Sequence, residues 1–347
     1  MRVPSLTRGI LLVGLLVLPL GHATRAVAAG VVGNGSATSC TEAALNAAVT
    51  NGGTVTFNCG PAPFTITLTA PLVISFDTTF DGGGLLTLSG NRKSLIFLVS
   101  SDTTLNLSNT TLTRGTFSFG GAIYNDVNGT LNVTNCSLHH NKAPGGEADG
   151  GAIDNYGTLT VSNSTFYLNT TGGVSGAVEN NGTMTVSNST FYRNHALVGG
   201  AIASAGPLTI TNTTFYRNST FFYGSGGAIY SAGTTTLQNT ILANSRRGEN
   251  VVGPVIDGGH NLRWPVRDKT GVGAYGDPKL GFLSNNGGTV KTVRLRPGSA
   301  AINAGDNALC TANPVNSLDQ RGFGRPGVGA TNCSIGAYEF DGSLPLP

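Results

Sequence analysis

Short stretches of alternating apolar and polar residues recur through the middle of the chain. Three successive examples are LTVS at 159–162, MTVS at 184–187 and LTIT at 208–211. Alternation with a period of two places one face of a β-strand inward and the other outward. Gly or Asn residues bound each stretch, and the apolar spacing of an amphipathic helix is absent. The pattern predicts short strands separated by tight turns.

These stretches belong to a longer repeated unit. Five copies lie at 120–141, 150–169, 175–194, 199–218 and 226–245. In the central copies an Ile or Val precedes the alternating stretch and a Phe follows it, which adds two inward positions. One unit cannot enclose a core, but units stacked ~4.8 Å apart would pair every strand with its neighbouring copy. The predicted fold is therefore all-β: a single-domain, right-handed parallel β-helix of the pectate-lyase-like type.

The boundaries of this solenoid follow from the same patterns. We expect the β-helix to cover residues 30–260, with its most regular coils at about 104–245. The only predicted helix, TEAALNAAV at 41–49, would cap the open first coil. Residues 261–347 would form the last coils and an irregular C-terminal cap that terminates the solenoid.

Two columns of Asn accompany the apolar columns. Asn tolerates left-handed turns, and stacked amides can hydrogen-bond from coil to coil. We expect two structural ladders. The first comprises Asn135, Asn163, Asn188, Asn212 and Asn239, and the second Asn141, Asn169, Asn194, Asn218 and Asn244.

The first 29 residues have the pattern of a secretory signal peptide. Two Arg residues precede an apolar stretch at 9–20, and small residues follow at 26–29. The stretch is shorter than the ~20 residues of a transmembrane span, so we expect secretion and no transmembrane segment after cleavage. The signal carries three of the 20 basic residues and no acid, so the mature chain has 17 of each charge. This balance, without clustered Lys or Arg, argues against a nucleic-acid partner.

Composition supports the same fold. The chain has 51 Gly among 347 residues and only 11% charged residues. Because Gly disfavours helices, this composition favours a turn-rich β-protein.

The five cysteines fit a secreted protein, since disulfides persist outside the cell. Cys40 and Cys59 would tie the N-terminal segment, and Cys310 and Cys333 the C-terminal one. Cys136 remains as a small buried residue. No Cys/His spacing indicates a zinc site, and no cofactor is expected.

The repeats resemble those of a known class of surface protein. GGAI begins four copies, at 120, 150, 199 and 226, and Phe-x-x-Asn occurs in three of the five copies, at 166, 191 and 215. This pairing resembles the repeat of chlamydial polymorphic outer membrane proteins, which are surface adhesins. The resemblance implies a β-helix and an adhesin-like role.

The C-terminus carries a second resemblance. The segments SNNGGTVKTVRLRPGSAAINAGDNALC at 284–310 and DQRGFGRPGVGATNCSIGAYEF at 319–340 resemble the terminal region of bacterial choice-of-anchor Q proteins. The segment at 40–60 is similar to the start of those secreted β-helices. The family commonly adds a surface-sorting tail, whereas this sequence ends in FDGSLPLP. We therefore expect a protein that is secreted or associated with the cell surface without its own C-terminal anchor.

Carboxylates in the repeats are the candidates for catalysis. Asp154 and Glu179 occupy one column, and Asp149 is close in sequence. Paired carboxylates can serve general acid/base chemistry or bind Ca²⁺. The alternative is an exposed turn with solvated acids, because other copies have Tyr or Ala at this position. A pectin hydrolase would require an Asp-Asp pair and a Gly-His-Gly triplet. Neither is present, and His139 and His140 are assigned to repeat turns.

A second candidate site is a Tyr/Arg stripe. Tyr192 and Arg193 align with Tyr216 and Arg217 in the next copy. Aromatic faces stack on sugars and Arg is frequent at interfaces, so this stripe could bind a glycan or a protein. The alternative is structural stacking alone.

Charged residues near the C-terminus are interpreted as structural. Asp319 would pair with Arg321 or Arg325 while the cap satisfies the last backbone groups of the solenoid, with Glu339 nearby. Trp264, the only tryptophan, is expected in the cap core.

The combined prediction is a monomeric, non-enzymatic binding protein or envelope component whose partner is a glycan or a cell surface. The alternative is a polysaccharide lyase or glycoside hydrolase that acts on acidic glycans through Asp154 and Glu179.

Overall fold

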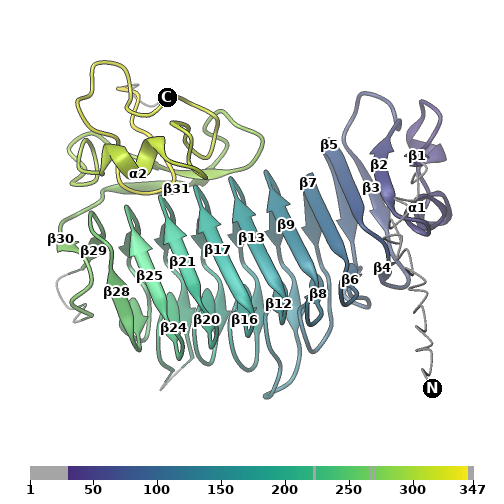
Figure 1. Ribbon diagram of the computed structural model, residues 1–347, viewed down its shortest axis with the longest axis horizontal. Helices are drawn as coiled ribbons and strands as arrows, with labels where there is room; N and C mark the ends of the chain where they lie inside the picture. The colour runs from purple at the N-terminus through teal and green to yellow at the C-terminus, as the bar shows by residue number, and fades with distance from the viewer. Residues whose placement is uncertain (1–29, 222–223, 266–267, 269, 343–347) are drawn as a thin grey trace, which may run out of the picture.

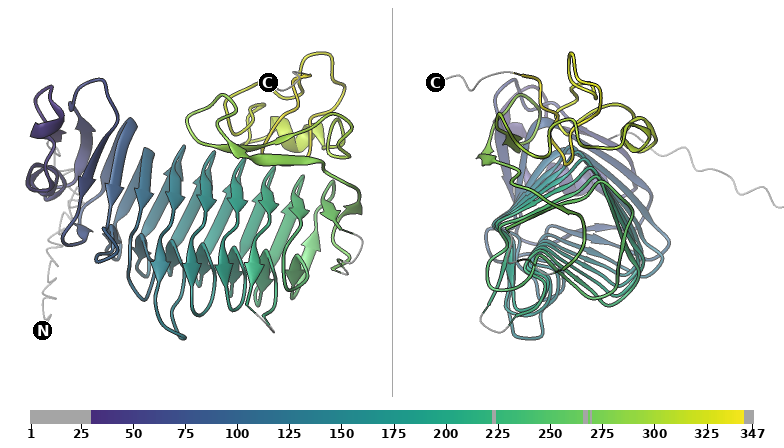
Figure 2. Two further views of the ribbon diagram at one scale, coloured as in Figure 1. Left: turned by 180° about the vertical axis from the view of Figure 1, so that it is seen from behind. Right: turned by 90° about the vertical axis from the view of Figure 1, so that its left-hand side faces the viewer.

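The computed structural model describes residues 30–221, 224–265, 268 and 270–342. The predicted signal peptide at 1–29 lies outside the described residues. Successive coils stack in register along one axis, with their strands parallel (Figure 1). Seen along this axis, the coils superimpose (Figure 2). The predicted all-β solenoid is therefore confirmed.

The largest sheet contains two neighbouring runs of parallel strands. The first run is formed by the alternating stretches and begins next to the N-terminus. Its members are β1 (Gly30–Val32), β2 (Gly53–Phe57), β5 (Thr78–Ser89), β7 (Thr104–Thr113), β9 (Thr130–Thr134), β13 (Thr158–Ser162), β17 (Thr183–Ser187), β21 (Leu208–Thr211), β25 (Thr235–Gln238) and β28 (Val255–Asp257).

The second run follows a sharp corner in every coil. The long strands β5 and β7 bend at this corner and belong to both runs. The other members are β3 (Phe64–Thr67), β10 (Ser137–His139), β14 (Thr165–Tyr167), β18 (Thr190–Tyr192), β22 (Thr214–Tyr216), β26 (Ile241–Ala243), β29 (Leu262–Trp264) and β30 (Ala274–Tyr275). We call the outward surface of the second run the lateral face.

Two further parallel sheets close the coils. The larger one contains β4 (Leu72–Ile74), β6 (Phe97–Val99), β8 (Ile123–Asn125), β12 (Ile153–Asn155), β16 (Val178–Asn180), β20 (Ile202–Ser204), β24 (Ile229–Ser231) and β27 (Val251–Val252). The smaller one contains β11 (Lys142–Ala143), β15 (Thr170–Thr171), β19 (His195–Ala196) and β23 (Ser219–Thr220).

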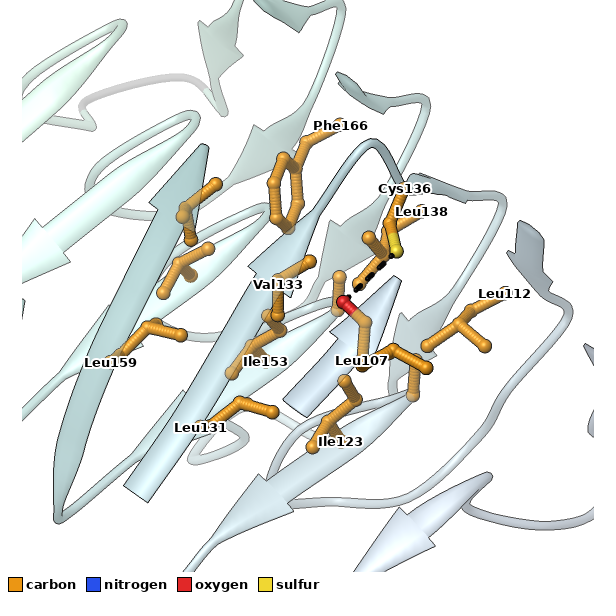
Figure 3. Packing of buried hydrophobic residues seen from close by; sticks show 14 of the residues in the cluster. Leu107, Leu112, Ile123, Leu131, Val133, Cys136, Leu138, Ile153, Leu159 and Phe166 are labelled. Carbon is orange, nitrogen blue, oxygen red and sulfur yellow. Dashed lines mark hydrogen bonds between the residues drawn. The ribbon is translucent and has the colours of Figure 1, made fainter. Parts of the chain in front are cut away.

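Apolar columns fill the interior of the solenoid, as the alternation predicts (Figure 3). Phe166, Phe191 and Phe215 stack face to face, with ring centroids 4.8 and 4.9 Å apart. Cys136 is free and fully buried, and its Sγ donates to the Leu107 carbonyl at 3.7 Å. Burial raises the pKa of the Cys136 thiol to about 12, so this residue is the inert filler that the sequence predicts.

The second Asn column forms a buried ladder. Asn141 donates to Asn169, Asn169 to Asn194, and Asn194 to Asn218, each at 3.0 Å. The expectation for Asn244 was wrong by one position. In the register of β22 and β26, Tyr216 pairs with Ala243, so Ser245 continues the column and Asn244 occupies the left-handed corner.

The first Asn column serves the corner between the two runs. All five members have positive φ, from 44° to 53°. Asn tolerates this left-handed conformation better than other residues with a side chain. Asn239 donates to the Asn212 side chain at 3.1 Å, whereas Asn188 donates to the Leu318 carbonyl. The column is therefore mainly a set of turns, part of which binds the C-terminal region.

The N-terminal cap matches the prediction. Helix α1 (Glu42–Val49) begins after Thr41, whose side chain accepts a hydrogen bond from the Ala44 N–H. The helix packs against the first coil (Figure 1), and its Leu45 and Val49 are buried. The Cys40–Cys59 disulfide ties this helix to the end of β2. Within the described residues no helix has the length and apolarity to cross a membrane.

Residues 277–342, which we call the C-terminal region, contain the hairpin β31 (Leu280–Ser284) and β32 (Thr292–Leu295), α2 (Asn307–Thr311) and irregular loops. The Cys310–Cys333 disulfide crosslinks it. The region lies outside the coils, along the flank of the solenoid from about β17 to β29 (Figures 1 and 2). The C-terminal region was expected to terminate the solenoid. This expectation was wrong, because the region lies beside the coils and covers part of the lateral face.

Candidate functional site

The carboxylate pair lies in a strand and not in an exposed turn. Asp154 on β12 pairs in register with Glu179 on β16. Both point away from the core, yet Asp154 has no exposed surface and Glu179 is 8% exposed. Both carboxyl oxygens of Asp154 and Oε2 of Glu179 have no hydrogen-bond partner. The interpretation of solvated acids was therefore wrong.

Burial determines the protonation of this pair. Burial, together with nearby Asp149, raises the pKa of Asp154 to about 7. Burial, Asp149 and Asp154 raise the pKa of Glu179 well above its usual range. A raised pKa suits a general acid, but a substrate cannot contact a carboxyl group that has no exposed surface. The arrangement therefore favours a protonated, structural pair over a catalytic one.

The Tyr/Arg stripe lies on the lateral face. Tyr192 and Tyr216 are buried beneath the C-terminal region, in a second apolar cluster with Val293 and Tyr338. Their Arg neighbours stand at the edge of this cluster. Arg193 lies over the Tyr192 ring at 5.2 Å, and Arg217 over the Tyr216 ring at 4.9 Å. The two tyrosines thus bind the chain's own C-terminal region, and only the arginines remain partly accessible.

Outward hydroxyl groups hold the C-terminal region in place. Thr190 donates to Gln320 Oε1 at 2.6 Å, and Gln320 Nε2 donates to Thr165 Oγ1 at 2.7 Å. Thr165 in turn donates to the Lys291 carbonyl at 2.6 Å. The lateral face therefore binds another part of the chain through hydroxyl groups that repeat from coil to coil.

Charged residues inside the C-terminal region fix its loops. Arg321 pairs with Asp319 at 2.8 Å and lies between the Phe323 and Tyr338 rings. The predicted Asp319–Arg321 pair is thus present. Arg325 pairs with Glu339 at 3.2 Å.

Arg325 also donates to the carbonyl groups of Leu318, Ser334 and Gly336. These acceptors lie within the C-terminal region itself. The expectation that Arg325 satisfies the last backbone groups of the solenoid was therefore wrong. Trp264 lies on β29, where it packs against the second apolar cluster and stacks on Tyr275.

The N-terminal part of the lateral face is open. Its outward hydroxyl groups come from β3, β5 and β7, coils over which the C-terminal region does not extend (Figure 1). A groove of about 450 Å³ lies there. Its lining residues combine hydroxyl groups with basic side chains: Thr65, Thr87, Ser89, Arg92, Thr113, Arg114, His139 and His140.

This groove continues the Tyr/Arg stripe. Thr113, His139 and Tyr167 are partners in register and lead directly to Tyr192. From the sequence, His139 and His140 were expected in turns, and neither Arg92 nor Arg114 was a candidate binding residue. A signal was available, since following the column of Arg193 toward the N-terminus through the strand register leads past Leu168 to His140 and then to Arg114.

Two histidines form one wall of the groove. His139 Nδ1 lies 2.8 Å from His140 Nδ1 and 3.1 Å from Thr113 Oγ1. The Tyr167 ring stacks on His139 with centroids 4.6 Å apart. Burial, together with His140, Lys291 and Arg114, lowers the pKa of His139 to about 4. Burial, Arg114, Arg92 and Lys291 likewise lower the pKa of His140. The groove is therefore strongly electropositive.

Metal binding has little support in the described part of the chain, where no group of three or more His, Cys, Asp or Glu residues is arranged to hold a metal ion. Asp149, Asp154 and Glu179 are the acidic residues that would hold a Ca²⁺ ion if one bound to the chain.

Comparison with known proteins bears on the repeats. The family model described as "Right handed beta helix region" matches residues 86–246. The solenoid is a right-handed parallel β-helix. No curated protein and no solved structure matches the chain significantly. The match spans the β-helix coils from the second half of β5 to the residues after β26, which include most of the basic groove.

Proposed function

We propose that this β-helix is a secreted, non-enzymatic binding protein that holds a glycan chain along the open part of its lateral face. The basic groove is the observation that carries the proposal. It is lined by hydroxyl and basic side chains, it is accessible, and it belongs to the same face that already binds the C-terminal region.

Three further features support this role. Stacked coils present equivalent hydroxyl groups every ~4.8 Å, which suits a ligand that is itself a repeating polymer. The two disulfides are typical of a protein outside the cell. The repeat resembles that of surface adhesins. Together they favour an adhesin-like or envelope-associated protein that acts as a monomer.

A groove-blocking substitution tests the proposal. Thr87 is an outward, half-buried residue in the groove, so Thr87→Trp should fill it and abolish binding on a glycan array. Thr209→Trp is the matched control, since Thr209 is an exposed outward residue of the first run on β21. We expect the control to bind like the natural protein. If no glycan binds the natural protein, or if both variants bind equally, the proposal is wrong.

A carbohydrate-active enzyme is the second candidate. It is favoured by the raised pKa of Asp154, which suits a general acid. Such an enzyme would release unsaturated products or new reducing ends from pectin or alginate. The Asp154→Asn/Glu179→Gln variant should then lose turnover while remaining folded. We expect no products from the natural protein, because the Asp154 carboxyl group is enclosed.

A further inference from the structure

Several cations converge on the groove without an acidic partner. Arg92 and Arg114 are exposed, and in the described part of the chain neither forms an ion pair. Lys291 reaches the same place from the C-terminal region, with its Nζ 5.8 Å from the Tyr167 ring. The groups that act electrostatically on the two histidines are all basic. Uncompensated positive charge in a concave site favours an anionic ligand.

The backbone holds these basic side chains in an unusual conformation. Arg114 and His140 occupy successive left-handed corners, and Arg193 and Arg217 follow in the same column after Leu168, all with φ between 53° and 59°. At the other corner of the same coils every position in the first ladder is Asn, the residue that tolerates this conformation best. The basic residues at the lateral corners are therefore in a strained conformation. Such strain is characteristic of binding sites. We therefore infer that the basic side chains at these corners also have a binding role.

The histidine pair can respond to a bound anion. A contact of 2.8 Å between two Nδ1 atoms requires one nitrogen to donate and the other to accept. A proton added to the accepting Nδ1 would place two donors opposite each other, next to Arg92, Arg114 and Lys291. An anion in the groove would favour this protonation. It would neutralise the surrounding positive charge, and it would accept a hydrogen bond from the N–H that is freed. Tyr167 is a further titratable group that directly contacts the pair.

We propose that the groove binds an acidic glycan, whose carboxylate or sulfate groups contact Arg92, Arg114 and His140 on successive coils, and that binding is coupled to proton uptake by the His139–His140 pair. The inference rests on the proposed function and specifies its ligand. The coil spacing of ~4.8 Å is close to the length of one pyranose ring, so a chain running along the axis can place one sugar over each coil.

A glycan fits this groove better than a nucleic acid does. The floor consists of hydroxyl groups, which bind sugars. Nucleic-acid grooves instead interleave basic residues with free aromatic faces on which bases stack. Here the nearest ring, Tyr167, is already stacked on His139.

Calorimetric binding measurements at pH 5.5 and 7.5 test both parts of the proposal. The probes are polygalacturonate for carboxylate, dextran sulfate for sulfate, dextran as the neutral polymer and oligo-dT for phosphate. We expect one of the two acidic glycans to bind at least tenfold more tightly than dextran or oligo-dT. Affinity should weaken with added salt and increase as the pH falls, because the bound anion raises the low pKa of His139. Titration in buffers of different ionisation enthalpy should show net proton uptake.

Variants separate the charge contacts from the proton uptake. Arg114→Ala should weaken binding of the acidic glycan at least tenfold, whereas Lys93→Ala removes an equal charge from an exposed residue outside the groove lining and should change little. His139→Gln/His140→Gln should abolish proton uptake and flatten the pH dependence. Thermal unfolding of each variant verifies its folding.

Each contrary outcome has a distinct meaning. Equal binding of dextran and the acidic polymers would overturn this inference and leave the glycan-binding function standing. Preferred binding of oligo-dT would overturn both, as would the absence of binding to every polymer. Binding of an acidic glycan without proton uptake would overturn the role of the histidine pair.

Discussion

Asp154 and Glu179 illustrate how burial changes the role of a side chain. Their column was visible in the sequence, but its environment was not, because other residues cover the outward side of β12 and β16. Tyr156 belongs to the same environment: burial, then Asp154 and Asp149, raise its pKa to about 12. Protonated, the acids are tolerated without a cation. Ionised, they would be two adjacent buried charges with no partner.

This predicts a stability that decreases with rising pH. The pKa of Asp154 is higher in the folded chain, at about 7, than in the unfolded chain, at about 3.9. The stabilising contribution of protonated Asp154 to the free energy of unfolding is therefore complete below about pH 4 and is lost as the pH rises through 7. Asp154→Asn should make the protein more stable than the natural one at pH 8, by roughly 2 to 4 kcal/mol, and similar to it at pH 4.5.

Urea unfolding at the two pH values measures this difference. Asp102→Asn is the control, since Asp102 is an exposed residue. Equal stabilities of the natural protein and Asp154→Asn at pH 8 would contradict the assignment.

At the scale of elements, the side-chain ladder beside β15, β19 and β23 links successive coils. Asn194 accepts from the Asn169 backbone and side chain, and donates to Asn218 and to the Phe166 carbonyl. Because the site is fully buried, water cannot replace these partners. Asn194→Ala should lower the free energy of unfolding by about 2 to 4 kcal/mol.

Chemical denaturation compares this variant with Asn181→Ala, which truncates an exposed Asn. The control should change the free energy of unfolding by less than ~0.5 kcal/mol. A near-neutral Asn194→Ala would mean that the ladder contributes little.

At the scale of the whole molecule, the lateral face divides into a covered and an open part. Gln320 connects the C-terminal region to two coils through three buried hydrogen bonds, to Thr190, Thr165 and the Ser164 carbonyl. Gln320→Ala should therefore loosen the C-terminal region, at a cost of about 2 to 4 kcal/mol in its docking, while the coils remain folded.

Limited proteolysis would detect this as faster cleavage within 277–342, with circular dichroism unchanged. Thr289→Ala, at an exposed residue of the same region, should be cleaved like the natural protein. Simultaneous loss of the coils would show that the C-terminal region and the solenoid form one cooperative unit.

The sequence by itself determined the stacked coil, its inward columns such as Phe166, Phe191 and Phe215, and the pairing of its cysteines. The coil and its columns were predictable because they arise between residues one coil apart, where periodic spacing reports the contact directly. The cysteine pairs were predictable because the partners are close in sequence, 19 and 23 residues apart. Docking of the C-terminal region joins residues about 130 positions apart, such as Thr190 and Gln320, with no periodic signal. Only the tertiary structure therefore decided that Tyr192 is covered, that Asp154 is enclosed, and that Arg114 and His140 line an open groove.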